Sequence, residues 1–170
     1  MNDSLVSTSS LLDRSVNGLL NDFGAGNSAP GSGSAAALMG ILAGKLITTV
    51  CSLSLKKAAQ EKQGIDDGSI KSSQLKFIPF ENQFQFIIDD IKNIIEPELK
   101  YLFEEDSKEF EKVVELRRKR IQAENDGYKD LQSKYNKESL DKLQHVTDFV
   151  FRISDQCFRL IEHGNFIFDR

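Results

Sequence analysis

The stretch PGSGSAAALMGILAGKLITTVCSLSLKK, residues 30–57, decides the fold of this chain. Its apolar residues recur with helical periodicity, which predicts one long helix from about Ser32 to Lys62. Along that helix a small residue stands at every fourth position: Ser32, Ala36, Gly40, Gly44, Thr48 and Ser52. Such a row forms a groove that lets another backbone approach closely, and this packing offsets a cost of about 1 kcal/mol for each mid-helix glycine. We expect the groove to hold either another helix of the same chain or the same helix of a second subunit.

A short amphipathic helix is expected ahead of this stretch. Ser9 or Ser10 can cap its start and Gly24 can end it. After the long helix, residues 63–74 form a polar linker.

Helical periodicity also dominates the second half of the chain, where strand-like alternation is nearly absent. A long helix is predicted from about Phe80 to Glu124, and Pro97 should kink or divide it.

The pattern lapses over residues 125–136 around Gly127. A last helix then shows apolar residues at 3-4 spacing: Leu143, Val146, Val150, Ile153, Cys157 and Leu160. Its opposite face is expected to be solvated and carries charged residues: Arg152, Asp155, Arg159 and Glu162. We therefore predict one all-α domain over residues 1–170, an antiparallel bundle of four to five helices.

The composition is that of an ordinary soluble globular protein, with 39% hydrophobic and 28% charged residues among 170. The net charge of −4 argues against a nucleic-acid partner, because phosphate binding needs a concentrated basic face. The one dense basic run, residues 117–120, follows an acidic stretch, and we interpret it as a solvated helix end.

The cysteines and the N-terminal residues indicate a cytoplasmic protein. Cys51 and Cys157 each lie in a helical apolar pattern, and two cysteines make no disulfide framework, so we expect buried thiols in a reducing compartment. Residues 1–10 are polar and Ser-rich, without the apolar core of a signal peptide.

A membrane-spanning helix is the alternative for residues 35–55. This segment is apolar, is long enough to cross a bilayer and contains a G-x-x-x-G pattern. Lys45 would then lie near the middle of the span, at a cost of roughly 3 kcal/mol. Several hydroxyl side chains add polarity, and no aromatic belt flanks the segment. We favour a protein without a membrane partner.

The first candidate site is Pro30-Gly31-Ser32-Gly33-Ser34, directly before the long helix. A helix N-terminus presents unpaired N–H groups and partial positive charge, and glycines let a ligand approach them, which suits an anionic or carbonyl-rich ligand. The alternative is a plain serine cap after a flexible loop, and spacing alone favours it.

The second candidate is Asp106, which lies on the apolar stripe of its helix between Phe103 and Phe110. Burial there penalises the charged form unless donors or a cation hold it. Such a carboxylate is a candidate general acid or base. It can equally be a structural acid that pairs with a lysine or caps a neighbouring helix. Glu104 and Glu105 lie off the stripe and are expected to face solvent.

The third candidate is Lys56-Lys57, near the end of the long helix. Either lysine can pair with an acid in a cleft, although cations at a helix C-terminus are favoured by the helix dipole alone. His145 and His163 are isolated from other ligating residues, so no metal site is predicted.

Three segments together resemble one known family. Pro30-Gly31-Ser32-Gly33-Ser34-Ala35-Ala36-Ala37-Leu38-Met39-Gly40 is similar to its Pro-Gly-Gly-Gly-Ser loop and small-residue helix, which ends near a lysine. Residues 105–113 look like its Asp-x-x-x-Phe helix, and residues 153–165 look like its late helix and Gly-Asn turn. The family is that of formiminotetrahydrofolate cyclodeaminase and methenyltetrahydrofolate cyclohydrolase, which includes the cyclodeaminase domain of formiminotransferase-cyclodeaminase.

This resemblance implies an all-α homodimer acting on a one-carbon tetrahydrofolate, with no covalently bound cofactor. The implied reaction is either ring closure of 5-formiminotetrahydrofolate with loss of ammonia or hydrolysis of 5,10-methenyltetrahydrofolate. Pro30 to Ser34 would bind the ligand, while Asp106 and Lys57 would match the acid and the lysine of the family.

A non-catalytic alternative stays open, in which the chain is a diverged helical dimerisation or ligand-binding module of the same fold. Ser32 stands where the family has its middle glycine, and residues 114–118 replace an expected Leu-Pro-Lys segment. The retained loop and acid positions favour the enzyme.

Overall fold

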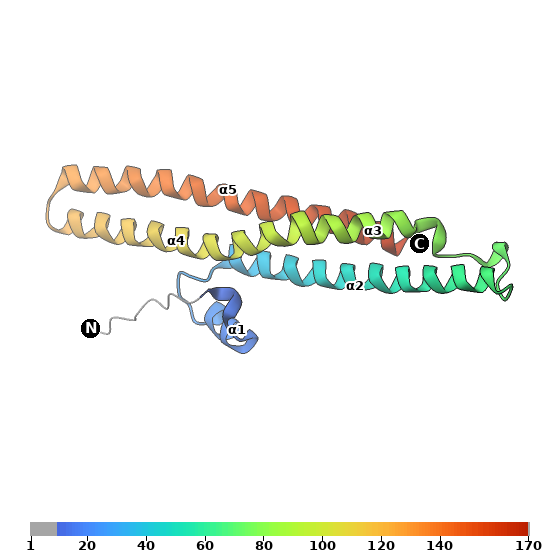
Figure 1. Cartoon of the computed structure of the whole chain (residues 1–170). Helices are drawn as coiled ribbons and strands as arrows, with labels where there is room; N and C mark the ends of the chain where they lie inside the picture. The colour runs from blue at the N-terminus through green and yellow to red at the C-terminus, as the bar shows by residue number, and fades with distance from the viewer. Residues whose placement is uncertain (1–9, 170) are drawn as a thin grey trace. The chain divides into compact units, whose positions relative to one another are not determined.

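The computed structural model describes residues 10–169, apart from the side chain of Ser72, and these residues form helices and turns without any strand. This confirms the predicted all-α class. The candidate cap Ser9 lies outside the described residues. Figure 1 shows the main helices, which are α1 (Val16–Gly24), α2 (Ser32–Asp66), α3 (Glu81–Asp90), α4 (Glu96–Asn125) and α5 (Lys129–Phe168). Shorter elements connect them: η1 (Leu11–Asp13), η2 (Ser72–Gln74), η3 (Ile78–Phe80) and the π-helical segment η4 (Ile91–Ile95).

The chain divides into two compact units that share its long helices. Unit 1 contains residues 1–38 and 100–153, and unit 2 contains residues 39–99 and 154–170. Each unit has its own buried apolar residues, as expected where amphipathic helices pack side by side.

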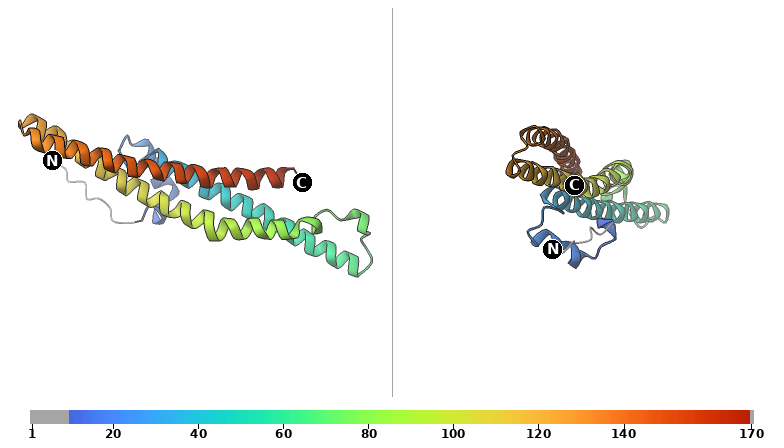
Figure 2. Two further views of the ribbon diagram at one scale, coloured as in Figure 1. Left: turned by 90° about the horizontal axis from the view of Figure 1, so that it is seen from above. Right: turned by 90° about the vertical axis from the view of Figure 1, so that its left-hand side faces the viewer.

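In unit 1, α4 and α5 run side by side, as the views of Figures 1 and 2 agree. Gly127, with φ of 77°, turns the chain between them, and the N–H of Tyr128 bonds back to the carbonyl of Ala123 at 2.9 Å. Helix α4 therefore ends in the common way, in which a glycine with positive φ follows the last turn and a backbone N–H beyond it bonds to a free carbonyl of that turn. The large apolar side chains that α4 and α5 bury in this unit are Leu102, Phe103, Val113, Val146, Phe149 and Ile153.

In unit 2, the glycine row of α2 meets other helices of the same chain. A Cβ added to Gly40 would lie 2.9 Å from Leu99 and 3.1 Å from the Cys157 sulfur. One added to Gly44 would lie 3.3 Å from Ile91 and 3.5 Å from Leu160. The groove at both glycines is therefore filled by side chains of this chain, not by the backbone of another helix.

Pro97 interrupts the third predicted helix, as its chemistry requires. The proline has no N–H, and its ring excludes the carbonyl four residues earlier. The chain accommodates it with the π turn η4, in which the N–H of Glu96 bonds to the carbonyl of Ile91. The single helix expected from about Phe80 to Glu124 is thus divided into α3, η4 and α4.

Other boundaries differ from the prediction. Helix α2 continues to Asp66, and α5 begins at Lys129 although the apolar pattern lapses there. Residues 129–142 are rich in good helix formers, so propensity and packing against α4 extend the helix where periodicity is weak. The expected Gly-Asn turn was also wrong, because Gly164 and Asn165 lie within α5.

The charged face of α5 is not wholly solvated, contrary to expectation. Asp90 of α3 is buried, and Arg159 binds it at 2.5 Å while the His163 Nε2 lies 2.7 Å from its other oxygen. Because a buried carboxylate is costly without partners, this cluster fixes the end of α5 against α3.

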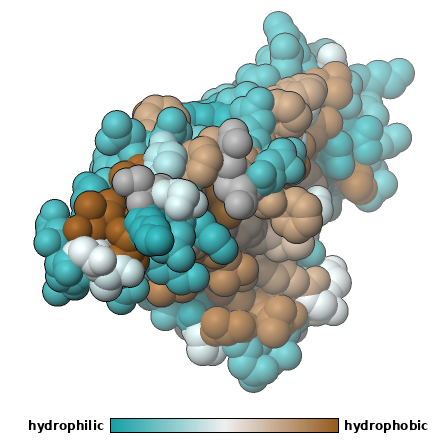
Figure 3. All heavy atoms as spheres, turned by 90° about the vertical axis from the view of Figure 1, so that its right-hand side faces the viewer, coloured by the Kyte–Doolittle hydropathy of each residue, from teal (hydrophilic) through white to brown (hydrophobic). Residues whose placement is uncertain are grey.

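Helix α2 is long and apolar enough to cross a membrane by length and composition alone. Lys45 within it pairs with the buried Glu96 at 2.7 Å. Apolar side chains also reach the surface, and Figure 3 shows them among polar ones on the face it displays.

Replacing Gly40 by isoleucine should destabilise the protein, because the new side chain collides with Leu99 and Cys157. We expect a loss of about 1–3 kcal/mol in the free energy of unfolding, measured by urea denaturation. Ala36→Ile is the matched control, since Ala36 belongs to the same row but is exposed. Equal stability of both variants would show that the Gly40 contact is not tight.

Candidate functional site

The candidate loop enters α2 through buried Pro30, which follows Ala29 in a cis peptide bond. The carbonyl of Gly31 accepts the first helical bond, from the N–H of Ala35 at 3.0 Å. Ser32 is exposed at the start of the helix, whereas Ser34 is completely buried. The loop therefore places the Ser34 hydroxyl and the backbone amides of the first turn of α2 within unit 1.

Asp106 of α4 caps this helix from outside. Its Oδ2 accepts hydrogen bonds from the Ser34 N–H at 2.8 Å and from the Ser34 hydroxyl at 3.0 Å. A carboxylate at a helix N-terminus satisfies an orphan donor and interacts favourably with the helix dipole. From the sequence alone, the simple alternative was that a serine of α2 caps α2 itself. In the structure, an acid from another helix caps it instead.

Gly33 is the residue that permits this approach. A Cβ built on Gly33 would lie 2.4 Å from the Asp106 Oδ1 and 2.6 Å from its carboxyl carbon. No real side chain tolerates such distances, so only glycine allows the carboxylate to reach the Ser34 amide. The sequence indicated a glycine for close approach of a ligand, and here the approaching group is the protein's own acid.

Asp106 is buried, and only one of its two carboxylate oxygens accepts the hydrogen bonds described above. Asp106 is only 5% exposed. Within residues 10–169, Ser34 is its hydrogen-bond donor, and both bonds go to Oδ2. The other oxygen, Oδ1, lies against Gly33 and accepts no hydrogen bond from the described residues.

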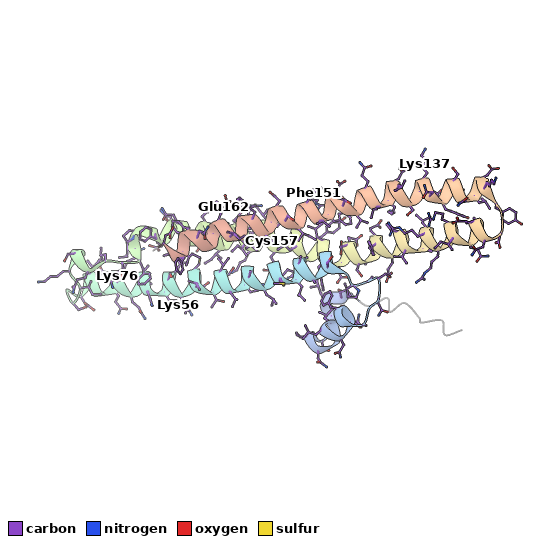
Figure 4. All side chains as sticks on the ribbon, turned by 180° about the vertical axis from the view of Figure 1, so that it is seen from behind. Lys56, Lys76, Lys137, Phe151, Cys157 and Glu162 are labelled. Carbon is purple, nitrogen blue, oxygen red and sulfur yellow. The ribbon has the colours of Figure 1, made fainter. Side chains whose placement is uncertain are left out.

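The other predicted residues are placed differently. Lys57 is exposed in unit 2, where its ammonium lies 5.0 Å from the centre of the Phe77 ring. Lys56 is also exposed and points away from its helix in Figure 4. The structure thus joins Gly33, Ser34 and Asp106, while Lys57 takes no part in their contacts.

Comparison with known proteins bears on this arrangement. A sequence profile described as formiminotransferase-cyclodeaminase matches residues 15–167, which include the loop and Asp106. The chain belongs to the formiminotransferase-cyclodeaminase family. The family name indicates a folate-related cyclodeaminase domain. Neither the curated proteins nor the solved structures gave a match.

The acids around Asp106 in this cyclodeaminase-family chain have structural partners. Glu104 was expected to face solvent, but it accepts hydrogen bonds from Ser10 and from the Leu12 N–H at 2.9 Å. Burial acts to raise the pKa of Glu104, yet these hydrogen bonds prevail and lower it. This contact ties η1 to α4 two residues before Asp106, and no local sequence pattern predicts it.

Glu109, one turn after Asp106, is likewise held. Hydrogen bonds from Lys112 and Lys142 lower the pKa of Glu109 and outweigh its burial. Because Lys142 belongs to α5, this pair fixes α4 to its neighbour next to Asp106. Glu104 and Glu109 therefore position the helix that carries the acid.

Two hollows of unit 1 lie between α4 and α5 and do not include Asp106 or residues 30–34. The larger has a volume of about 340 Å³ and is lined by Arg117, Arg120, Asn136, Ser139 and Leu140. The smaller is lined by Arg120, Lys129, Gln132, Ser133 and Asn136. Within the basic run, Arg117, Arg118 and Lys119 are exposed, as expected, and Arg120 is half-buried. No cluster of metal-ligating side chains forms among the described residues.

Gly33→Ala should destabilise the protein by about 1–3 kcal/mol, because its Cβ collides with the Asp106 carboxylate. The cost should vanish when Asp106 is replaced by alanine, since the colliding atoms are then absent and alanine favours helix. Urea denaturation of the two single variants and the double variant gives this coupling. An equal cost of Gly33→Ala in both backgrounds would contradict the described contact.

Proposed function

We propose that this chain is an enzyme of one-carbon tetrahydrofolate chemistry. The reaction is either cyclisation of 5-formiminotetrahydrofolate with release of ammonia or hydrolysis of 5,10-methenyltetrahydrofolate. Family membership supports the substrate class. The observation that carries the proposal is the buried Asp106, whose carboxylate caps the first turn of α2 through Ser34.

Both reactions pass through an amidine-type carbon and require a proton to move. In cyclisation, N10 attacks the formimino carbon, the bond to the amino nitrogen breaks, and the proton lost by N10 balances the one gained by ammonia. In hydrolysis, water adds to the methenyl carbon, the bond from that carbon to N5 breaks, one proton of the water goes to N5, and the other is released because the cationic substrate becomes a neutral formyl compound. A single positioned carboxylate can accept and return that proton.

Asp106 suits this role by its position and its charge. The methenyl bridge is cationic, and a carboxylate in a water-poor site stabilises positive charge more strongly than it would in water. Ser34 holds Oδ2, which orients the carboxyl group so that Oδ1 serves as the proton-transferring atom.

The loop supplies the complementary part of the site. Amide groups of residues 31–33 at the positive end of α2 favour the carboxylates of the glutamate tail of folate or a carbonyl of the pterin ring. Pro30, Gly31 and Ser32 shape the loop around these groups. The substrate itself is the folate, so the mechanism needs no covalently bound cofactor.

We also propose that the protein is a cytoplasmic homodimer. The free thiols of Cys51 and Cys157 suit a reducing compartment. The face of α2 turned away from the glycine row exposes large apolar side chains, including Leu46 with 68% of its surface accessible. A second copy covering this face would remove apolar area from water.

Asp106→Asn should lower turnover of the active substrate by about 10²–10⁴-fold while leaving affinity nearly unchanged, because the amide keeps the shape but cannot transfer the proton. Turnover is measured by the loss of methenyltetrahydrofolate absorbance and, in a separate assay, by ammonia release from 5-formiminotetrahydrofolate. Glu105→Gln is the control, since Glu105 binds Lys108 on the surface of the same helix turn.

Unchanged turnover in Asp106→Asn would remove this acid from the mechanism. A wild-type protein that binds 5-formyltetrahydrofolate but turns over neither substrate would favour the non-catalytic ligand-binding module instead.

A further inference from the structure

The two hollows between α4 and α5 both include Arg120 and Asn136, so they adjoin one another, and we call them together the hairpin groove. These parts of α4 and α5 lie side by side within unit 1 (Figure 1). Three cations line the groove, Arg117, Arg120 and Lys129, and its other lining residues are uncharged. A chain with a net charge of −4 therefore concentrates positive charge at one place between two packed helices.

The cations of the groove are not neutralised by the described part of the chain. The side chains of Arg117, Arg120 and Lys129 make no ion pair or hydrogen bond within it, whereas the neighbouring Lys119 binds Glu115 at 2.5 Å. The Arg120 Nε is buried and lacks a hydrogen-bond acceptor. Because a buried donor without an acceptor is costly and like charges repel, this side of the groove favours an anion.

Helix α5 supplies uncharged donors on the other side of the groove. Ser139 lines it and is only 4% exposed, and its hydroxyl has no hydrogen-bond partner among residues 10–169. A threonine or serine in mid-helix can donate its hydroxyl to the carbonyl four residues earlier, as Thr147 does to Leu143 at 2.9 Å. The Ser139 hydroxyl is not engaged in this way, and Asn136 adds a side-chain amide one turn before it.

We propose that the hairpin groove binds a phosphate group, with the guanidinium groups of Arg117 and Arg120 on one side and the side chains of Asn136 and Ser139 on the other. This site is separate from the proposed folate site and does not depend on it. Arg117 lies eleven residues after Asp106 along α4, which is roughly 16 Å at 1.5 Å per residue.

The donors of the groove suit a phosphate better than a carboxylate. A guanidinium group binds two oxygens of one anion with two parallel N–H bonds, so the two oxygens of a carboxylate are satisfied by a single arginine. A phosphate has tetrahedral oxygens and up to two negative charges. Two arginines of α4 and the hydroxyl and amide donors of α5 can therefore each bind a different part of the same group.

Acids of the surrounding turns do not take the place of this anion. Glu138 lies 3.9 Å from Lys134, and Asp126 accepts hydrogen bonds from Gln122, the shorter at 2.9 Å. Glu124, four residues after Arg120, is exposed and lines neither hollow. The chain thus leaves the guanidinium groups of the groove to a ligand.

The size of the groove admits more than a free phosphate ion. Its larger hollow has a volume of about 340 Å³, at the lower end of the range for small-molecule pockets, and Leu140 adds an apolar wall. A free phosphate and the phosphate of a small organic ester share the chemistry that the groove recognises, and binding measurements with both distinguish the two sources.

Calorimetric titration of the full chain tests the site. Inorganic phosphate and glycerol 3-phosphate are the probes, and glutarate, with two carboxylates, is the control anion. In about 0.15 M salt, attraction between exposed charges is screened beyond about 8 Å. At least one phosphate probe should bind saturably with a stoichiometry of one, and glutarate should bind at least tenfold more weakly. The tighter of the two probes identifies the source.

Variants of the groove distinguish its geometry from its charge. Arg120→Lys keeps the charge but loses the planar fork, so phosphate affinity should fall about ten- to a hundredfold. Ser139→Ala, which removes one hydroxyl, should lower it several-fold. Arg118→Gln is the matched control, because Arg118 belongs to the same basic run but is exposed and lines neither hollow. Its phosphate affinity should equal that of the wild type, and so should that of Asp106→Asn.

Three results would overturn the proposal. The first is the lack of binding heat with millimolar phosphate and glycerol 3-phosphate, and the second is glutarate binding as tight as theirs. The third is an equal loss of affinity in Arg118→Gln and Arg120→Lys, which would assign binding to the charge of the basic run. Displacement of phosphate by 5-formyltetrahydrofolate would make the groove part of the folate site and contradict a separate one.

Discussion

The hydrogen bonds from Ser34 to the Asp106 carboxylate are the contact on which the candidate site depends. They satisfy the N-terminus of α2 with a group from α4, two segments far apart in the sequence. The contact exists only because Gly33 has no side chain, since a Cβ there would lie 2.4 Å from the carboxylate oxygen. Gly33 thus allows the acid of α4 to lie against the first turn of α2.

The remaining interactions of unit 1 keep that acid in place. Glu104 binds the segment before α1, and Glu109 binds Lys142 of α5, so the turns on both sides of Asp106 are fixed. Ser34 binds one oxygen of this carboxylate, and in the proposed function the other oxygen meets the substrate. The same design explains why a residue with a structural role can also be the proposed proton-transferring group, and the two interpretations of Asp106 are compatible.

Much of this could be predicted from local patterns. Helical periodicity gave the all-α class, the start of α2 at Ser32 and the disruption at Pro97, and the spacing of Gly40 and Gly44 predicted close helix packing. The family resemblance is confirmed by the match over residues 15–167. Long-range pairs could not be predicted, because periodicity does not specify partners. Asp90 with Arg159 and His163, Glu104 with Ser10, and Lys45 with Glu96 each join segments that no spacing rule connects.

The central claim is that the amides of the α2 loop and the carboxylate of Asp106 face one bound folate. The most direct measurement is the backbone amide NMR spectrum of the ¹⁵N-labelled protein during titration with 5-formyltetrahydrofolate. The signals of Gly33 and Ser34 should shift and saturate together with those of residues around Asp106. Unchanged signals at these positions with millimolar ligand, or shifts confined to other residues, would contradict it.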